Sequence, residues 1–389
     1  MSGSDTKPNR VILVQPTLPK YRVPVYRGFA ERPQIDLRLW FGNHTQLKNA
    51  EPEGFDGELR PMRQWVLGSQ EAMWHQAQLD AARDPDADAI ILSWSSRYLS
   101  LGPALRTAKR RGLPVVLWGH GYSRSESPWR VWARNRLASM AGALLFYDDQ
   151  TAQAAIDSGW DADRVFVAPN AIDQTPIAAA REAWRADPER LERFRADEGL
   201  NDRDLLLYVS RLSEKAEIPL LLEAVDKLRR RRPQLLLALI GDGEMQEELE
   251  RRIPQLGLQD HVRMVGPIYE QDRLAPWFLT AELFVYPTAI GLSLLHAMGY
   301  GLPVVTDDRM GGHFPEIVAF NPDPDSPDAN GATYRAGDTD SFADTLEALL
   351  DDPARRKALS AGGIRTVEQR YNVPAMVDGM VAAVERALH

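Results

Sequence analysis

Short apolar runs alternate with helical stretches along most of the chain. In the first half the apolar runs fall at 11–14, 37–41, 89–94, 115–118, 143–147 and 165–168. The stretches 70–82, 103–111, 129–139 and 150–158 between them are predicted to be helices. Strands that alternate with helices form parallel sheets covered by helices on both faces. Because the second half alternates in the same way, the sequence predicts an α/β protein with two Rossmann-like domains.

Composition limits the class of protein. At 389 residues, of which 44% are hydrophobic, the chain is long enough for two buried cores. The polar start, MSGSDTKPNR, predicts no signal peptide, and no apolar run approaches the roughly 18 residues of a membrane-spanning helix. The chain has no cysteine, so disulfides and thiolate metal sites are excluded, and its net charge of −9 argues against nucleic-acid partners. We therefore expect a soluble cytoplasmic protein.

The first predicted strand is followed by QPTLPKYR at residues 15–22. A dinucleotide-dependent dehydrogenase would be the default expectation for a parallel sheet of this kind. Such enzymes carry G-x-G-x-x-G between the first strand and the first helix, and this segment does not. The sequence therefore argues against an oxidoreductase.

One stretch in the second half, residues 281–306, reads AELFVYPTAIGLSLLHAMGYGLPVVT. A strand-like run ends at Pro287, and a short loop leads into a helix that begins near Leu292. Open parallel sheets hold their ligands at such strand–loop–helix connections. The backbone N–H groups of Gly291, Leu292 and Ser293, at the positive end of the helix dipole, would suit a phosphate.

This stretch resembles the donor-site signature of retaining family-4 glycosyltransferases of the GT-B superfamily, which move sugars from nucleotide-sugars. The family pattern runs P-S-x-x-E-G-F-G-L-x-x-L-E-A-M-A-x-G-x-P-V-V. The chain matches it at Pro287, Gly291, Leu292, Leu295, Ala297, Met298, Gly301, Pro303, Val304 and Val305. Both glutamates of the family's E-x7-E pair are replaced, the first by Thr288 and the second by His296.

Two cations follow the first predicted strand of the second half. Arg211 and Lys215 lie four residues apart after the run 205–209, so both can reach one point. The segment resembles the family's V-G-R-L-x-x-x-K motif, in which these positions neutralise the diphosphate. Breaking a sugar–phosphate bond places negative charge on the leaving group, which fixed cations stabilise. We expect both residues to bind the donor and to be catalytic; the alternative is a strand-end arginine with a solvated lysine.

The resemblance implies further donor contacts. Ile268 would border the nucleotide base, Thr288 would meet the donor sugar, and His296 would contact the ribose, unless it is a structural histidine. Gly312 and Glu316 come from GGHFPEIV, which resembles the family's G-G-x-P-E-I-V and would bring backbone N–H groups and a carboxylate to the donor. For Glu316 the alternative is a simple helix-start residue. The glycines of Gly241-Asp242-Gly243 are expected to serve a tight turn and close packing.

Acceptor contacts are expected in the first half. The segment 16–26, PTLPKYRVPVY, resembles an acceptor-side loop of some family members, with Lys20, Tyr21 and Arg22 facing the acceptor; a proline-stiffened surface loop is the alternative. His120 lies between two glycines after the run 115–118. The resemblance implies that it is catalytic, by hydrogen-bonding the donor sugar or the acceptor; a structural histidine is the alternative. The basic and tryptophan-bearing stretch 103–136 is a candidate for peripheral membrane contact. Its tryptophans would otherwise pack inward.

The resemblance implies two domains facing across a cleft. Residues 1–173 would bind the acceptor, 174–203 would connect, 204–370 would bind the nucleotide-sugar, and the helix 371–389 would pack back on the first domain. The reaction would retain anomeric configuration and need no metal or cofactor. It would glycosylate a glycan or lipid-linked acceptor in envelope or exopolysaccharide assembly, at the inner face of the plasma membrane. The alternative is a non-catalytic sugar-nucleotide binder or partner subunit; a related epimerase would need acid/base residues that we cannot place.

Overall fold

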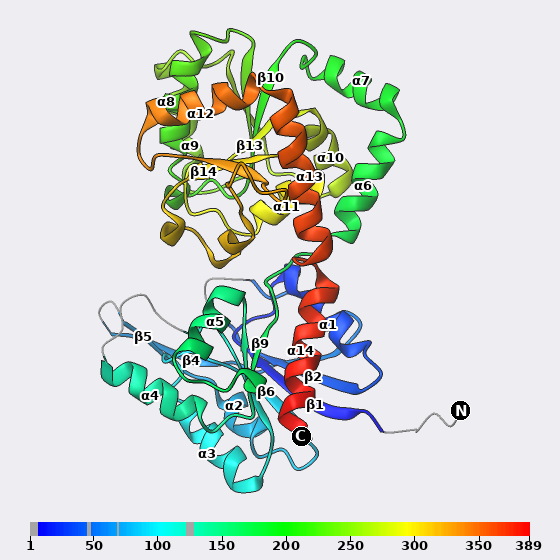
Figure 1. The fold of residues 1–389 in the computed structure, drawn as a ribbon, viewed down its shortest axis with the longest axis vertical. Coiled ribbons are helices and arrows are strands. Elements are labelled where there is room, and N and C mark those ends of the chain that lie inside the picture. Colours follow the sequence, from blue (N-terminus) through cyan, green and yellow to red (C-terminus); the bar gives the residue numbers. More distant parts are fainter. Residues whose placement is uncertain (1–6, 45–47, 68–69, 122–127) are drawn as a thin grey trace. The chain divides into compact units, whose positions relative to one another are not determined.

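The structure is a computed structural model that describes residues 7–44, 48–67, 70–121 and 128–389. It divides into two compact units (Figure 1). Unit 1 comprises Met1–Ile172 together with Asn372–His389, and unit 2 comprises Asp173–Tyr371. Each unit is described by itself below.

Unit 1 is built on a seven-stranded sheet in which all neighbouring strands run parallel. Its order is β3-β2-β1-β6-β7-β8-β9, so the direction in which strands are added reverses between β1 and β6. The strands are β1 (Asn9–Gln15), β2 (Ile35–Phe41), β3 (Asp56–Leu59), β6 (Ala89–Ser93), β7 (Val115–Trp118), β8 (Ala143–Phe146) and β9 (Val165–Val167). Six of them coincide with predicted strands, and β3, whose residues are mostly exposed, was not predicted.

Both faces of this sheet are buried, because its central strands contain unbroken apolar runs such as 11–14 and 89–92. Val11 and Leu13 of β1 belong to one core, and Ile12 and Val14 belong to the other. The first core packs against α1 (Val23–Ala30) and α14 (Val373–Leu388), and the second packs against α2 (Gln76–Ala81) and α3 (Leu101–Arg111). The unit also contains α4 (Pro128–Ala138) and α5 (Asp149–Asp157). The last helix of the chain is thus part of unit 1 (Figure 1).

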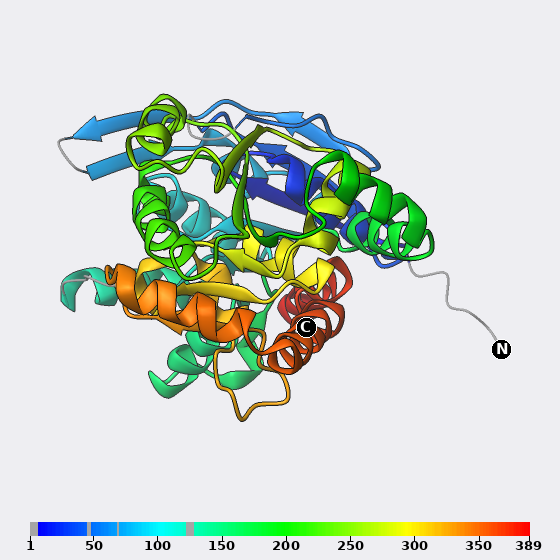
Figure 2. The same ribbon diagram turned by 90° about the horizontal axis from the view of Figure 1, so that it is seen from above.

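Two sequence predictions for unit 1 were wrong. Residues 70–82 are not one helix: β4 (Arg63–Leu67) and β5 (Gln70–Trp74) form an antiparallel pair before α2 begins. The pair extends outward from the body of unit 1 (Figures 1 and 2). The segment 16–26 is not entirely loop, because Lys20–Arg22 form a 3-10 turn and α1 starts at Val23.

Unit 2 contains a six-stranded parallel sheet with the order β12-β11-β10-β13-β14-β15. The strands are β10 (Asp204–Val209), β11 (Leu235–Ile240), β12 (Val262–Gly266), β13 (Leu283–Val285), β14 (Val304–Asp307) and β15 (Gly331–Tyr334). The surrounding helices are α8 (Ile218–Arg229), α9 (Gln246–Gln255), α10 (Gln271–Thr280), α11 (Ser293–Tyr300), α12 (Thr339–Leu350) and α13 (Pro353–Gln369). The strand order reverses between β10 and β13, where such sheets place ligands.

Residues 174–203 form two further helices of unit 2, α6 (Thr175–Arg185) and α7 (Pro188–Asp197). Asp187 accepts a hydrogen bond from the backbone N–H of Arg190 and so caps α7. The buried guanidinium of Arg181 donates to the carbonyl oxygen of Gly299 at 2.8 Å, which ties α6 to α11. The segment is therefore packed into unit 2, although the sequence suggested a connector.

Candidate active site

A hollow of about 480 Å³ opens beside the connections that follow β10, β13 and β14 in unit 2. It is lined by Lys215, Glu217, Thr288, Ala289, Arg309, Gly312, His313 and Phe314. Three of these residues, Lys215, Thr288 and Gly312, were predicted donor contacts from three separate motifs. The volume is in the usual range of small-molecule sites, roughly 300–1,000 Å³.

The two predicted phosphate cations differ in their surroundings. Lys215 is exposed in the 3-10 turn Glu214–Ala216 and lines the hollow. Arg211 has a side chain that is 73% exposed, and its Nη2 lies 3.0 Å from Glu244 Oε2. Lys215 is therefore the cation that faces the hollow directly, whereas Arg211 would have to leave Glu244 to bind an anion.

The G-D-G turn after β11 holds the backbone that carries these cations. A Cβ on Gly241 would lie 1.9 Å from the carbonyl oxygen of Ser210, and one on Gly243 would lie 2.4 Å from that of Leu212. Both glycines also have positive φ angles, 145° and 155°. The prediction that these glycines serve the turn and close packing is confirmed.

The connection from β13 to α11 forms another wall. Thr288 is buried, and Ala289 adopts a left-handed φ of 55°, which is uncommon for a residue with a side chain. No side chain caps α11, which begins at Ser293. Gly291 lies against Phe314, since a Cβ there would be 3.4 Å from the Phe314 ring. The start of α11, with Leu292 and Ser293, is thus beside the hollow, where its positive dipole end can act on an anion.

A buried histidine that sequence reasoning missed fixes this wall. His313 Nδ1 accepts a hydrogen bond from the backbone N–H of Ile290 at 3.3 Å, and its Nε2 lies 2.9 Å from Asp307 Oδ1. Because Nδ1 is an acceptor, Nε2 must carry the proton and donate it to the Asp307 carboxylate. Arg309 Nη2 contacts the other oxygen of Asp307 at 2.9 Å. Arg309 lines the hollow, and Asp307, the last residue of β14, holds its guanidinium in place.

Glu316 lies on the same side of unit 2 as the start of α11. It is buried, and its Oε2 would be 3.5 Å from a Cβ placed on Gly291. It belongs to the 3-10 turn Pro315–Ala319. A carboxylate beside the first turn of a helix is favourably placed in the helix dipole.

His296 does not line the hollow. Its Nε2 lies 2.9 Å from Gln271 Oε1, and its ring packs against Phe278 with centroids 5.0 Å apart. Tyr300 donates to the same Gln271 oxygen at 2.8 Å. Burial lowers the pKa of His296 to about 4, so the ring is neutral at pH 7. These contacts match the structural alternative that the sequence left open for this residue.

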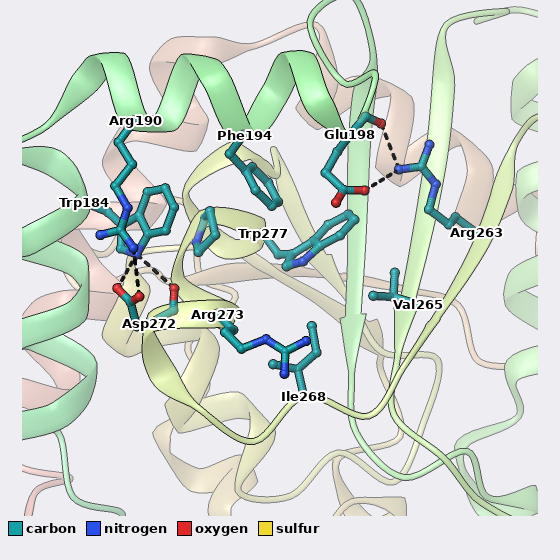
Figure 3. A pocket seen from close by; sticks show the side chains of 11 residues that line it. Trp184, Arg190, Phe194, Glu198, Arg263, Val265, Ile268, Asp272, Arg273 and Trp277 are labelled. Carbon is teal, nitrogen blue, oxygen red and sulfur yellow. Dashed lines mark hydrogen bonds and ion pairs between the residues drawn. The ribbon is translucent and has the colours of Figure 1, made fainter.

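Ile268 lines a different cavity, also of about 480 Å³, on the flank of unit 2 (Figure 3). Trp184, Phe194 and Trp277 supply its aromatic walls. Four of its charged groups form ion pairs with each other: Arg190 contacts Asp272 at 2.8 Å, and Arg263 contacts Glu198 at 3.1 Å. A fifth, Arg273, contacts Glu270 at 3.6 Å. The structure thus separates the predicted base contact from the hollow that holds Lys215.

The predicted acceptor residues lie in unit 1 at the carboxyl ends of β1 and β7. Lys20 is exposed, Tyr21 is half-buried, and Arg22 is only 6% exposed. His120 is solvent-accessible, but one face of its ring packs on Tyr147, with centroids 4.5 Å apart. The Arg22 guanidinium lies 5.4 Å from the centre of the same Tyr147 ring. Partial burial, and then the Arg22 charge, lower the pKa of His120, so the ring is neutral near pH 7.

Acidification is expected to destabilise both units. Burial lowers the pKa of His75 in unit 1 and of His296 in unit 2 to about 4, whereas an unfolded histidine titrates near 6.5. Between these values the unfolded chain binds more protons, so stability is fully present above about pH 6.5 and is lost as the pH falls toward 4. At pH 5 each histidine should lower the free energy of unfolding by about 2 kcal/mol.

Calorimetric melting between about pH 5 and 7 would measure this loss. His75→Gln and His296→Gln should each flatten the pH dependence of one transition, and His389→Gln, at the exposed end of the chain, should not. Unchanged slopes in both buried-histidine variants would contradict the assignment.

Known glycosyltransferases are similar to this chain in sequence and in fold. The family described as "Glycosyl transferase 4-like domain" matches residues 11–171, and "Glycosyl transferases group 1" matches residues 191–366. The GDP-mannose-dependent alpha-(1-6)-phosphatidylinositol monomannoside mannosyltransferase of Mycolicibacterium smegmatis is 28% identical over 72% of this chain and 71% of its own length. The D-inositol 3-phosphate glycosyltransferase of Frankia alni is 29% identical over 73% of this chain and 71% of its own.

Solved structures agree on the architecture. A glycosyltransferase from Rickettsia africae superposes with a TM-score of 0.71 at 12% identity, covering 98% of this chain and 99% of its own. Anabaena HepE in complex with UDP superposes with a TM-score of 0.68 at 16% identity, covering 97% and 99%. With its two parallel α/β units, the chain has the GT-B fold. Its two halves match two glycosyltransferase domain families, with the group 1 family matching the second half, and the chain is a glycosyltransferase enzyme.

Proposed function

We propose that this enzyme transfers a hexosyl or deoxyhexosyl group from a nucleotide diphosphate-sugar to a hydroxyl of a glycan or lipid-linked acceptor, with retention of anomeric configuration. The observation that carries the proposal is the meeting of Lys215, Thr288 and Gly312 in one hollow at the strand-order reversal of unit 2. Three motifs far apart in sequence supply these residues. A cation, a hydroxyl and a glycine whose backbone a ligand can approach closely are suited to a sugar diphosphate.

The hollow can stabilise a departing diphosphate. Lys215 and Arg309 bring positive charge to it, Arg211 can add a third cation, and the start of α11 contributes its dipole. In the retaining reaction that we propose, the acceptor hydroxyl attacks from the face that the diphosphate leaves, and a phosphate oxygen takes its proton. The bond to the acceptor forms as the sugar–phosphate bond breaks, so the protein supplies no nucleophile. Glu316 would provide the carboxylate that Thr288 does not.

The proposal includes no metal and no cofactor. Within the described residues, no cluster of three His, Cys, Asp or Glu side chains is arranged to hold a metal ion. The cations around the hollow can take the part that a divalent ion plays in other phosphate-transfer sites, which is to offset charge on the leaving group.

The donor and acceptor classes are supported by the relatives. One is named as dependent on GDP-mannose, and structural neighbours were crystallised with UDP and with UDP-glucose. Named acceptors of the relatives include a phosphatidylinositol mannoside and an inositol phosphate. We propose a role in assembling envelope glycolipid or polysaccharide at the cytoplasmic face of the plasma membrane.

A surface of unit 1 is suited to peripheral membrane contact. Lys109, Arg110 and Arg111 are exposed in the last turn of α3, and Trp132 of α4 is 68% exposed. Residues 122–127, and the side chains of Trp129 and Arg130, lie outside the described structure. No helix in the described ranges is both long and apolar enough to cross a bilayer. Weaker sedimentation of Trp132→Ala with anionic vesicles would support the contact, and equal sedimentation would contradict it.

A thermal-shift screen against UDP, GDP and their sugars, followed by a transfer assay, tests the main proposal. At 100 times its dissociation constant a ligand adds about 2.7 kcal/mol to the stability of the folded protein, which raises the melting temperature measurably. The absence of any shift would contradict the donor proposal. Tight nucleotide binding with neither hydrolysis nor transfer would favour a non-catalytic binder instead. Replacement of both E-x7-E glutamates, and the packing of His296 away from the hollow, are what favour that second candidate.

A further inference from the structure

Arg22 in unit 1 is a buried cation with no carboxylate beside it. The residue is 6% exposed, and none of the described residues places a carboxylate within ion-pair distance of its guanidinium. Its Nη1 donates to the sulfur of Met376 at 3.1 Å, and its guanidinium also interacts with the side chain of Tyr21. A guanidinium has five N–H donors, and a thioether is a weak acceptor, so these two neutral partners leave donors for a ligand.

Aromatic rings surround this cation. The guanidinium carbon lies 5.4 Å from the ring centre of Tyr21, 5.3 Å from that of Trp118 and 5.4 Å from that of Tyr147. Cation–π contacts of this kind lower the cost of burying the charge and do not use the in-plane N–H groups. The arginine is therefore held in a fixed orientation with donors available.

The acidic group beside His120 is engaged with its own helix. Asp148, which raises the pKa of His120, accepts hydrogen bonds from the backbone N–H and the hydroxyl of Thr151, at 2.7 and 2.8 Å. It caps α5 with those contacts. It is consequently not a counter-ion for Arg22.

The position of Arg22 is that of a ligand-binding residue. It follows β1, one of the two strands at which the order of the unit 1 sheet reverses. His120 follows β7 and packs on Tyr147, the ring that Arg22 also faces. Lys20, two residues before Arg22, is exposed and adds a second cation.

We propose that Arg22 binds an oxyanion, a phosphate or a carboxylate, carried by the acceptor, and so makes the enzyme specific for anionic acceptors. This inference rests on the proposed function, because it assigns unit 1 to the acceptor. Arginine presents paired N–H groups that match two oxygens of a phosphate or carboxylate, and its charge is retained at any physiological pH. His120 and Tyr21, beside it, can position the hydroxyl-bearing part of the same molecule.

The test uses the full chain with its nucleotide site saturated, so that a second anion cannot bind at Lys215. Binding of inorganic phosphate, acetate, glucose 6-phosphate and glucose is measured by calorimetry and thermal shift, with and without UDP or GDP. We expect glucose 6-phosphate to bind at least about tenfold more tightly than glucose. Tighter binding of phosphate than of acetate indicates a phosphate site, and tighter binding of acetate indicates a carboxylate site. Binding to phosphatidylcholine vesicles is compared with and without phosphatidylglycerol. Binding that requires phosphatidylglycerol indicates that the anion is a lipid phosphate and not a soluble one.

Arg22→Met and Arg22→Lys are the decisive variants. In Arg22→Met the anion preference should disappear while the nucleotide shift is unchanged, and the melting temperature should not fall, because an unpaired buried cation is removed. Arg22→Lys keeps the charge without the paired donors and should retain part of the preference. A preference that survives Arg22→Met, anion probes that bind no better than glucose, or a large drop in melting temperature in both variants would overturn the inference. Loss of the nucleotide shift in the unaltered protein would instead count against the proposed donor site.

Discussion

Replacing Lys215 by Met is expected to lower the rate of sugar transfer by about 10²–10³-fold. Lys215 is the predicted phosphate cation that lines the hollow, and it is exposed rather than held by a carboxylate in a buried pair. The diphosphate is already anionic in the bound donor and gains further charge as the sugar–phosphate bond breaks, so the loss should both raise the KM for the donor and lower kcat. Methionine keeps the length and the apolar part of the side chain, so the fold should be unaffected. Initial rates of transfer against donor concentration would measure the effect.

Two further variants show whether the loss of rate depends on the position of the cation or on the net charge of the protein. Lys357→Met removes an exposed cation from α13 in the same unit and should leave the rate unchanged. Arg211→Met should cost less than Lys215→Met, because Arg211 is engaged with Glu244 and largely exposed. Equal rates for Lys215→Met and Lys357→Met would remove the main support for the donor site.

Most of the fold could be predicted because most of the buried strands contain unbroken apolar runs. The run 11–14 supplies both faces of one sheet, and the run 235–240 is buried throughout the other. The strand β5 was predicted as helix because Gln70, Glu71, Ala72 and Met73 are good helix formers. Pairing with β4 overrides that preference, and no local pattern records which strand will be available as a partner.

One missed helix, α1, did carry a local signal, because Pro24 occupies its first turn. A proline at the start of a helix is favourable, because the first N–H groups have no partner within the helix. Weighing Pro24 as a helix start would have corrected the loop at 16–26. Pro188 likewise follows the capping residue Asp187 at the start of α7, in a charged run whose composition already favours helix.

The donor-site prediction depended on motifs, and motifs carry no information about which way a side chain points. Lys215, Thr288 and Gly312 meet in the hollow, whereas His296 packs against Phe278 and Ile268 lines another cavity. No sequence pattern indicated the role of His313, which links the loop at Ile290 to Asp307 at the end of β14. A histidine six residues after a strand has no recognisable spacing, because its partners are a distant backbone group and a buried aspartate.

Gly241→Ala is expected to remove nucleotide binding and to destabilise unit 2 by at least about 3 kcal/mol. The new methyl group would lie 1.9 Å from the carbonyl oxygen of Ser210, which is backbone and cannot turn aside as a side chain could. The φ of 145° at this position is also unfavourable for alanine. Relief requires that the segment leading to Arg211 and Lys215 move, so the cations lose their placement together with the stability.

Gly337→Ala separates the two causes of this effect. Gly337 also has a positive φ, 76°, but a Cβ there would meet nothing within 4 Å. Its replacement should cost only the conformational strain, about 1 kcal/mol, and leave nucleotide binding intact. For a unit of this size the difference between the two variants corresponds to a melting temperature lower by roughly 4–8 °C in Gly241→Ala. If both variants melted together and bound nucleotide equally, the G-D-G turn would have no part in holding the phosphate cations.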